Sequence, residues 1–175
     1  TQLLSNAVNQ LKGESKRTTT PSAMQENIPI DLPIPAYLPT GWIPEMELRL
    51  QIYRRMAGLG SSEDVDIMRE ELRDRFGALP TAVENLLFQI NIKLLAQAAG
   101  ASAITASNDR ILVRLPYLPD INRDNLQRQL GDIVQVTRTA IEVPRGDTDT
   151  WQIQLLDILE KLARAVEMTE SISGL

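Results

Sequence analysis

One stretch decides the architecture of this chain: Arg69-Glu70-Glu71-Leu72-Arg73-Asp74-Arg75-Phe76-Gly77-Ala78-Leu79-Pro80. Its charged first part is typical of the end of an exposed helix, which begins at Ser61 or Ser62 with Asp64 in an approximate capping box. Gly77 suits the stop position of that helix, and Pro80 suits the start of the next one. The stretch therefore predicts two helices joined by a short turn.

Helices are predicted on both sides of this turn. On the N-terminal side, Pro44 suits the first position of a helix that runs to about Ala57 and stops at Gly58. Two apolar stripes on it predict burial on more than one side: Leu48, Ile52 and Met56, and Met46, Leu50 and Tyr53. On the C-terminal side, a helix is predicted from near Pro80 to just before Gly100. It is the most apolar helix and is therefore predicted to be central. Its apolar side chains include Val83, Leu86, Leu87, Ile90, Leu94 and Leu95.

Strands are predicted after Gly100, where the apolar period changes to two. Residues 103–107 and 110–115 are expected to form a hairpin around Asn108-Asp109. Further strands are expected over 133–137 and 139–143. The second half of the chain therefore contributes a small, mostly antiparallel sheet.

Two more helices and an edge segment complete the expected fold. One helix covers 119–130, and a closing amphipathic helix covers 151–166 with the core stripe Ile153, Leu156, Leu159, Leu162 and Val166. The prolines of residues 28–35 forbid a central strand and favour an extended edge segment. Helices come first and the sheet follows, so the fold class is α+β: an N-terminal helical half followed by a small mostly antiparallel sheet with packed helices.

The chain length of 175 residues allows one ordinary domain with an extension. Residues 1–12 space their apolar side chains as one face of a short helix, and residues 13–27 have the composition of a flexible linker. We therefore expect one domain over 28–170.

Composition limits the chemistry that this chain can perform. It contains no cysteine and no histidine, which excludes disulfides, thiol nucleophiles, Ser-His and Cys-His catalysis and the usual zinc ligand sets. The net charge of −5 argues against a general nucleic-acid binder. No apolar run reaches the ~18 residues that indicate a membrane span, and the absence of cysteine fits a bacterial cytosol, so a cytoplasmic location is expected.

The helix over 61–76 has two chemically different faces. At ~100° per residue, Val65, Met68, Leu72 and Phe76 fall together and are expected to face the core. The opposite face carries Glu63, Ile67, Glu70, Glu71 and Asp74. Arg75 lies one turn after Glu71, whereas Glu63, Glu70 and Asp74 have no cation at the right spacing on this helix. The ordinary interpretation is a solvated surface, and the alternative is a docking face for a basic partner, indicated by the apolar Ile67 among the acids.

Two other functions stay open on the residues alone. One is a small enzyme that uses carboxylates and a divalent cation, although no acid/base pair can be singled out. The other is a nucleic-acid-binding module that uses Arg110, Arg114 and Arg138 of the later strands, with Tyr117 as the only stacking ring nearby.

Several segments of this sequence match one known family. They are Leu32-Pro33-Ile34-Pro35-Ala36-Tyr37-Leu38-Pro39, Trp42-Ile43-Pro44, Arg49-Leu50-Gln51-Ile52-Tyr53-Arg54-Arg55-Met56-Ala57, Glu71-Leu72-Arg73-Asp74-Arg75-Phe76-Gly77-Ala78-Leu79-Pro80 and Val83-Glu84-Asn85-Leu86-Leu87. Over about residues 28–100 the chain resembles the C-terminal domain of the bacterial transcription-repair coupling factor (Mfd). Residues 1–12 resemble the end of that family's motor domain.

The resemblance implies a regulatory domain and no catalytic residue. The family's full protein is an ATP-driven DNA translocase that acts on stalled RNA polymerase and recruits UvrA. Its ATP and magnesium belong to motor domains that are not present here, so no cofactor or metal and no direct nucleic-acid contact are expected. In the family, the C-terminal domain packs on the UvrB-like N-terminal module of the same protein and masks its UvrA-binding surface.

The family's contact can be carried onto this sequence at two positions. In the pattern Glu-Leu-x-Asp-Arg-Phe-Gly it falls on Glu71 and Asp74, which are expected to face arginines of the UvrB-like module. Glu63, Ile67 and Glu70 are added from the helical wheel alone.

Overall fold

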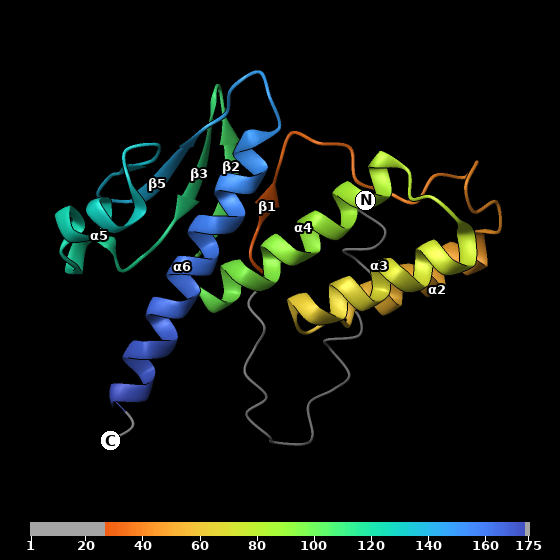
Figure 1. Ribbon diagram of the computed structural model, residues 1–175, viewed down its shortest axis with the longest axis horizontal. Coiled ribbons are helices and arrows are strands. Elements are labelled where there is room, and N and C mark those ends of the chain that lie inside the picture. The colour runs from red at the N-terminus through yellow and green to blue at the C-terminus, as the bar shows by residue number, and fades with distance from the viewer. Residues whose placement is uncertain (1–26, 174–175) are drawn as a thin grey trace, which may run out of the picture.

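A computed structural model describes residues 27–173. The predicted α+β class is confirmed: a helical half is followed by a small sheet with packed helices (Figure 1). The helices are α2 (Met46–Ala57), α3 (Ser62–Phe76), α4 (Thr81–Ala98), the 3-10 turn η1 (Leu118–Asp120), α5 (Arg123–Leu130) and α6 (Thr150–Ser173). The strands are β1 (Ile30–Asp31), β2 (Ala103–Ser107), β3 (Arg110–Arg114), β4 (Gln135–Val136) and β5 (Ala140–Pro144). The helix expected over 1–12 and the linker up to residue 26 lie outside the described residues.

The sheet has the strand order β1-β2-β3-β5-β4, and all pairs are antiparallel except β1 with β2. β1 is an edge strand, as the prolines around it predict. The β2–β3 hairpin turns at Asn108, whose φ of +52° is tolerated by asparagine in tight turns. Ile111, Val113 and Leu115 are buried together, which confirms the predicted inner face of the hairpin.

α4 lies between two hydrophobic cores and contributes one face to each. The helical core contains Val83 and Leu87 of α4 together with apolar side chains of α2 and α3. The sheet core contains Ile92 and Ala96 of α4 together with the sheet and α6. Positions 83 and 87 fall on one side of the helix and positions 92 and 96 on the other, so the predicted central role of α4 is confirmed. In Figure 1, α4 runs between the α2–α3 pair and the sheet with α6.

Three predicted helix or strand boundaries differ from those in the structure. Pro44 precedes the N-cap residue Glu45 of α2 instead of occupying its first turn. The region 119–130 is split into η1 and α5, because Asn122 caps a new helix by accepting the amide N–H of Asn125 at 3.0 Å. The strand expected over 133–137 is reduced to Gln135–Val136.

Two predicted apolar stripes are not buried as expected. On α2, Met46 is 66% exposed and Leu50 is also exposed, because α2 packs through Ile52 and Met56 and no described element covers its other side. On α6, Ile153 is 70% exposed. The buried stripe of α6 begins half a turn earlier, with Trp151, Leu155 and Ile158, and it includes the predicted Leu159 and Leu162. Within residues 27–173, no helix combines the length and the apolar character needed to cross a membrane.

Candidate docking face

α3 is held at both ends by local hydrogen bonds. The Ser61 hydroxyl accepts the amide N–H of Asp64 at 3.1 Å, which confirms the predicted N-cap. The Asp64 carboxylate accepts the amide N–H of Gly60 at 3.1 Å, one residue before the position that a regular capping box uses. At the other end, Gly77 has φ +80° and its N–H donates to Arg73 O at 2.9 Å. These contacts fix where α3 begins and ends, and so which residues it presents to solvent.

The inner side of α3 is the predicted one. Val65, Met68 and Leu72 are buried in the helical core. Phe76 is partly buried, and its ring meets that of Trp42 edge-on with centroids 5.4 Å apart. The Trp42 indole N–H donates to Phe76 O at 3.2 Å. Because both ends of the inner side are anchored, the outer side is fixed in orientation.

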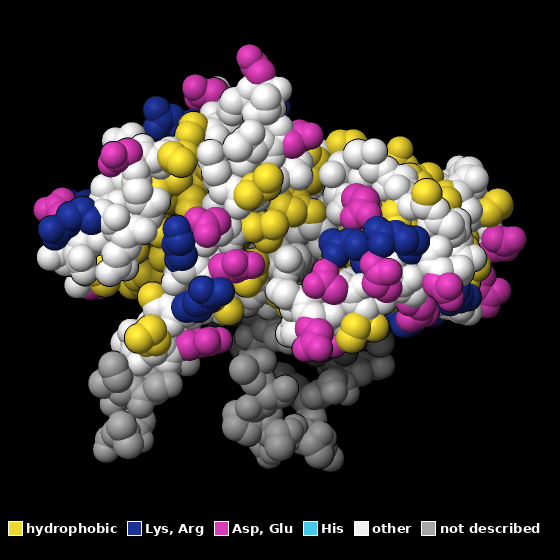
Figure 2. Space-filling model, in the orientation of Figure 1, with side chains coloured by type: hydrophobic (Ala, Val, Ile, Leu, Met, Phe, Trp, Pro, Cys, Tyr) yellow, Lys and Arg dark blue, Asp and Glu magenta, His cyan; other side chains and the backbone are white. Residues whose placement is uncertain are grey.

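The outer side of α3 carries the five predicted residues, and we call Glu63, Ile67, Glu70, Glu71 and Asp74 the docking face. Four of them are exposed, and Ile67 is 60% exposed. Glu71 is the exception: its side chain is only 33% exposed because it turns toward α2. Figure 2 shows acidic and basic side chains interleaved over the helical half of the molecule. The surface of the helical half is therefore mixed in charge and not an uninterrupted acidic patch.

Glu71 is engaged in an ion pair that sequence spacing does not reveal. Arg55 of α2 donates from Nη1 to Glu71 Oε1 at 2.5 Å and from Nη2 to Oε2 at 2.7 Å. Arg75, one turn later on α3, lies 3.6 Å from Oε1, as predicted. The hydrogen bonds from Arg55 lower the pKa of Glu71 below its ordinary value, and the same contact raises the pKa of Arg55. Glu71 is thus an ionised carboxylate whose two oxygens already have a cation.

Glu70 also has a cation, which makes one prediction wrong. Arg73 Nη1 lies 2.7 Å from Glu70 Oε1, an i,i+3 contact on the same helix. Glu63 and Asp74 make no ion pair with any residue whose side chain the structure describes. Of the four carboxylates in the docking face, these two are available to a partner without displacing another group.

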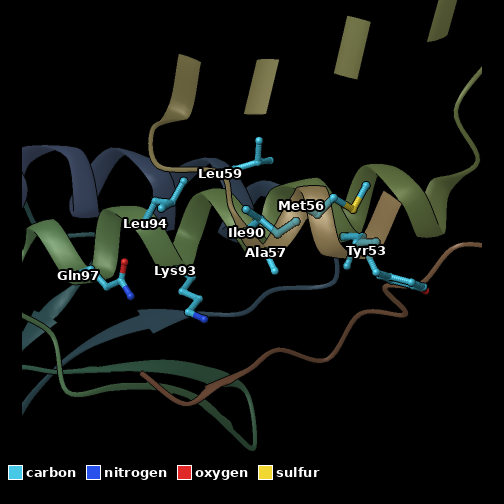
Figure 3. Close-up of a pocket in the computed structure, with 9 residues that line it drawn as sticks. Tyr53, Met56, Ala57, Leu59, Ile90, Lys93, Leu94 and Gln97 are labelled. Carbon is cyan, nitrogen blue, oxygen red and sulfur yellow. The ribbon is translucent and has the colours of Figure 1, made fainter. Parts of the chain in front are cut away.

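A second surface feature lies between α2 and α4. It is a groove of about 230 Å³, and Figure 3 draws the residues that line it. Its lining is largely apolar, with Lys93 and Gln97 at one end, and comprises Tyr53, Met56, Ala57, Leu59, Leu86, Ile90, Lys93, Leu94 and Gln97. The apolar spacing of α4 predicts that several of these side chains are in the core, and it does not predict a groove. Its walls carry no carboxylate, and in the described part of the chain no three Asp or Glu side chains gather closely enough to hold a metal ion.

Of the three arginines considered for nucleic-acid binding, Arg110 is engaged within the sheet, whereas Arg114 and Arg138 are exposed and form no ion pair with a side chain that the structure describes. Arg110 pairs with Glu142 on the neighbouring strand β5 and also donates to Gln135 Oε1 at 3.2 Å. Tyr117, the expected stacking ring, is partly buried, and its hydroxyl donates to Ala99 O at 2.8 Å. Burial raises the pKa of Tyr117. These contacts tie both side chains into the fold.

Comparison with known proteins places these features in a family. The model of the TRCF domain matches residues 32–126, a segment that includes the helical core, all of α3 and the β2–β3 hairpin. The chain belongs to the TRCF domain family. The resemblance drawn from the sequence is thereby confirmed, and all five residues of the docking face lie inside the matched segment.

Similar TRCF proteins are much longer than this chain. It is 34% identical over 121 residues to the transcription-repair-coupling factor of Mycobacterium bovis. The aligned segment covers 68% of this chain and 10% of that protein. It is 30% identical over 178 aligned positions to that of Staphylococcus epidermidis, covering 98% of this chain and 14% of that protein. The chain thus spans about a tenth to a seventh of these relatives.

A solved structure supports the TRCF fold assignment. The crystal structure of the C-terminal domain of a transcription-repair coupling factor superposes with a TM-score of 0.69 over 82% of this chain and 95% of that one. Sequence identity between the two is 18%, so this comparison concerns the fold alone.

Proposed function

We propose that this chain is a non-catalytic regulatory domain of a transcription-repair coupling factor. In this proposal, the docking face binds a basic surface of the UvrB-like N-terminal module of the same protein in the resting state. Docking masks the surface of that module that UvrA uses, and release during translocation along DNA exposes it. ATP, magnesium and RNA polymerase are bound by other domains of the parent, which acts in the cytoplasm.

The observation that carries the proposal is the position of Glu71 and Asp74. Both belong to the pattern Glu-Leu-x-Asp-Arg-Phe-Gly, in the segment that the family model matches. α3 turns both away from its buried side, and Asp74 is exposed without an ion pair among the described side chains. Ile67 adds an exposed apolar side chain between the acids, although single exposed apolar side chains are common on protein surfaces.

Electrostatics suits a contact that must be releasable. Partly exposed ion pairs contribute only about 0–1 kcal/mol each, so a few of them give a weak contact. Two domains of one chain meet at a high effective concentration, and a weak contact can then remain closed most of the time. A large apolar interface would hold the domain too firmly to be released by movement of the parent protein.

Binding of this chain to the UvrB-like module of its parent protein tests the proposal directly. The double variant Glu71→Ala/Asp74→Ala is expected to bind about two- to five-fold more weakly, the effect of losing one exposed ion pair at Asp74, because the partner's pair with Glu71 replaces the pair that Glu71 already makes with Arg55. The matched control Asp120→Ala/Asp147→Ala removes the same charge from exposed positions far from α3 and is expected to bind as the wild type does. Higher salt should weaken wild-type binding.

The same changes can be made in the full-length parent protein. There, Glu71→Ala/Asp74→Ala is expected to increase UvrA binding. The circular dichroism of the isolated domain that carries the same changes is expected to match that of the wild type. Unchanged UvrA binding, together with wild-type affinity of the isolated double variant for the UvrB-like module, would refute the proposed function.

A further inference from the structure

The Arg55–Glu71 pair engages one of the four carboxylates of the docking face. The two guanidinium nitrogens of Arg55 take one oxygen of Glu71 each, at 2.5 and 2.7 Å. This is the fork arrangement in which arginine binds carboxylates most strongly. A second arginine cannot make the same fork to Glu71 while Arg55 remains in place, because both oxygens are already used on that side.

We propose that Arg55 is an internal competitor: it holds Glu71 in the undocked state and must be displaced when a cation of the partner binds. The inference rests on the docking role proposed above and adds a residue that regulates it. Arg55 weakens docking in this way, because the partner's contact with Glu71 replaces the contact that Glu71 already makes with Arg55. The domain is thereby kept releasable.

The exposure of the pair permits such an exchange. The Arg55 side chain is 51% exposed and that of Glu71 is 33% exposed, so water and ions reach both. Pairs of this kind are worth little against solvation, and a partner arginine of equal strength replaces Arg55 at small cost. The pair also joins two helices across 16 residues of sequence, so its rupture leaves both helices held by the helical core.

A hollow beside the pair can receive the displaced side chain. It has a volume of about 320 Å³ between the end of α2 and the side of α3, and Arg55, Asp64 and Ile67 all line it. Asp64 stands two turns before Glu71 on the same side of α3 and is exposed. A displaced Arg55 guanidinium therefore stays close to another carboxylate instead of being left facing the cations of the partner.

The first experiment measures binding of four forms of this chain to the UvrB-like module: wild type, Arg55→Gln, Arg54→Gln and Glu71→Gln. Removing the competitor is expected to tighten binding about two- to five-fold, the factor that corresponds to an exposed ion pair. Arg54 is the matched control, because it precedes Arg55 in the last turn of α2, is exposed, lines the same hollow and has the same charge. Arg54→Gln removes that charge without freeing Glu71 and should change binding less than Arg55→Gln.

A double-mutant cycle separates competition from a general change in charge. If Arg55 acts through Glu71, then Arg55→Gln no longer tightens binding in the Glu71→Gln background. Arg55→Lys should bind with an affinity between those of the wild type and Arg55→Gln, because lysine keeps the charge but cannot form the fork. Carbon-13 NMR of the Glu71 carboxylate supplies a readout that needs no partner: Arg55→Gln should move its pKa up toward the ordinary value.

The outcomes distinguish this inference from the proposed function. Equal or weaker binding of Arg55→Gln, with Glu71→Ala/Asp74→Ala still impaired, would overturn the competition and leave the docking face intact. Wild-type binding by the Glu71→Ala/Asp74→Ala variant, or no binding by any form, would overturn both. The result that would support both the competition and the docking face has two parts. Arg55→Gln increases the binding affinity more than Arg54→Gln does, and this increase disappears in the Glu71→Gln background.

Discussion

Replacing Leu87 with alanine is expected to destabilise both halves of the domain to the same degree. Leu87 lies in the middle of α4, is fully buried and belongs to the helical core. The opposite side of α4 carries Ile92, which is fully buried in the sheet core. Because one continuous helix supplies a wall to each core, loss of packing on one side removes the support of the other.

The size of the effect follows from the burial of Leu87. The substitution removes three carbon atoms that have no contact with water. At roughly 0.8 kcal/mol for each buried methylene, their loss lowers the free energy of unfolding by about 2.4 kcal/mol. The cavity that remains raises the cost of Leu→Ala changes into a range of about 2.7–5.0 kcal/mol in a well-studied core. For a domain of this size, about 3 kcal/mol lowers Tm by about 6–12 °C.

The two tryptophans allow each half to be followed separately. Trp42 packs in the helical half against Phe76, and Trp151 packs in the sheet core against Phe88, with ring centroids 6.1 Å apart. Trp42→Phe and Trp151→Phe each leave one fluorescent reporter, and Leu87→Ala is introduced into both backgrounds. Thermal unfolding should show the same shift in Tm from both reporters.

A shift confined to the Trp42 reporter would refute the reasoning, because it would mean that the helical half unfolds without the sheet. The matched control is Ile153→Ala on α6, where the side chain is 70% exposed. It removes a similar amount of apolar side chain and is expected to change the free energy of unfolding by less than about 0.5 kcal/mol.

Three further changes test local features. Gly100→Ala should cost about 1–2 kcal/mol in urea unfolding because its φ of +73° disfavours a Cβ; an unchanged midpoint would contradict this. Tyr53→Phe removes the hydroxyl that accepts the Leu38 amide N–H at 2.7 Å, and should cost about 1–3 kcal/mol; a smaller loss would indicate that water replaces it. The hydrogen bonds from Arg55 hold the folded-state pKa of Glu71 below its ordinary value, so this pair stabilises the fold above the ordinary pKa and ceases to do so as pH falls through the lowered pKa. Glu71→Gln should therefore flatten the loss of stability as pH falls from the ordinary pKa of glutamate through the lowered pKa of Glu71, and parallel curves for both proteins would count against the pair.

The candidate site was predictable as far as its residues lie on one helix. The helical wheel separates the buried Val65, Met68 and Leu72 from the outer side, and the structure has the same division. The contact between Glu70 and Arg73 was also available from the i,i+3 spacing and was missed. The partner of Glu71 could not be found in this way, because Arg55 comes from another helix.

Apolar stripes were predicted less well than the ends of α3. Periodicity identifies the apolar positions of α6, but it does not say which stripe meets the sheet, and Ile153 was assigned to the core in place of Leu155. The same applies to Met46 and Leu50 on α2, which are as apolar as buried residues yet lie on the side that no described element covers. Burial depends on which other element is near, and hydrophobicity alone does not contain that information.

The sequence by itself determined the order of the elements, the ends of α3 at Ser61 and Gly77, and the turn of the hairpin at Asn108, because capping and turn preferences act between residues a few positions apart. Only the tertiary structure decided that α4 is shared by two cores and that Arg55 closes on Glu71 across 16 residues. Those contacts depend on how helices pack against one another, and packing is set by the shape of whole surfaces rather than by the neighbours of any one residue.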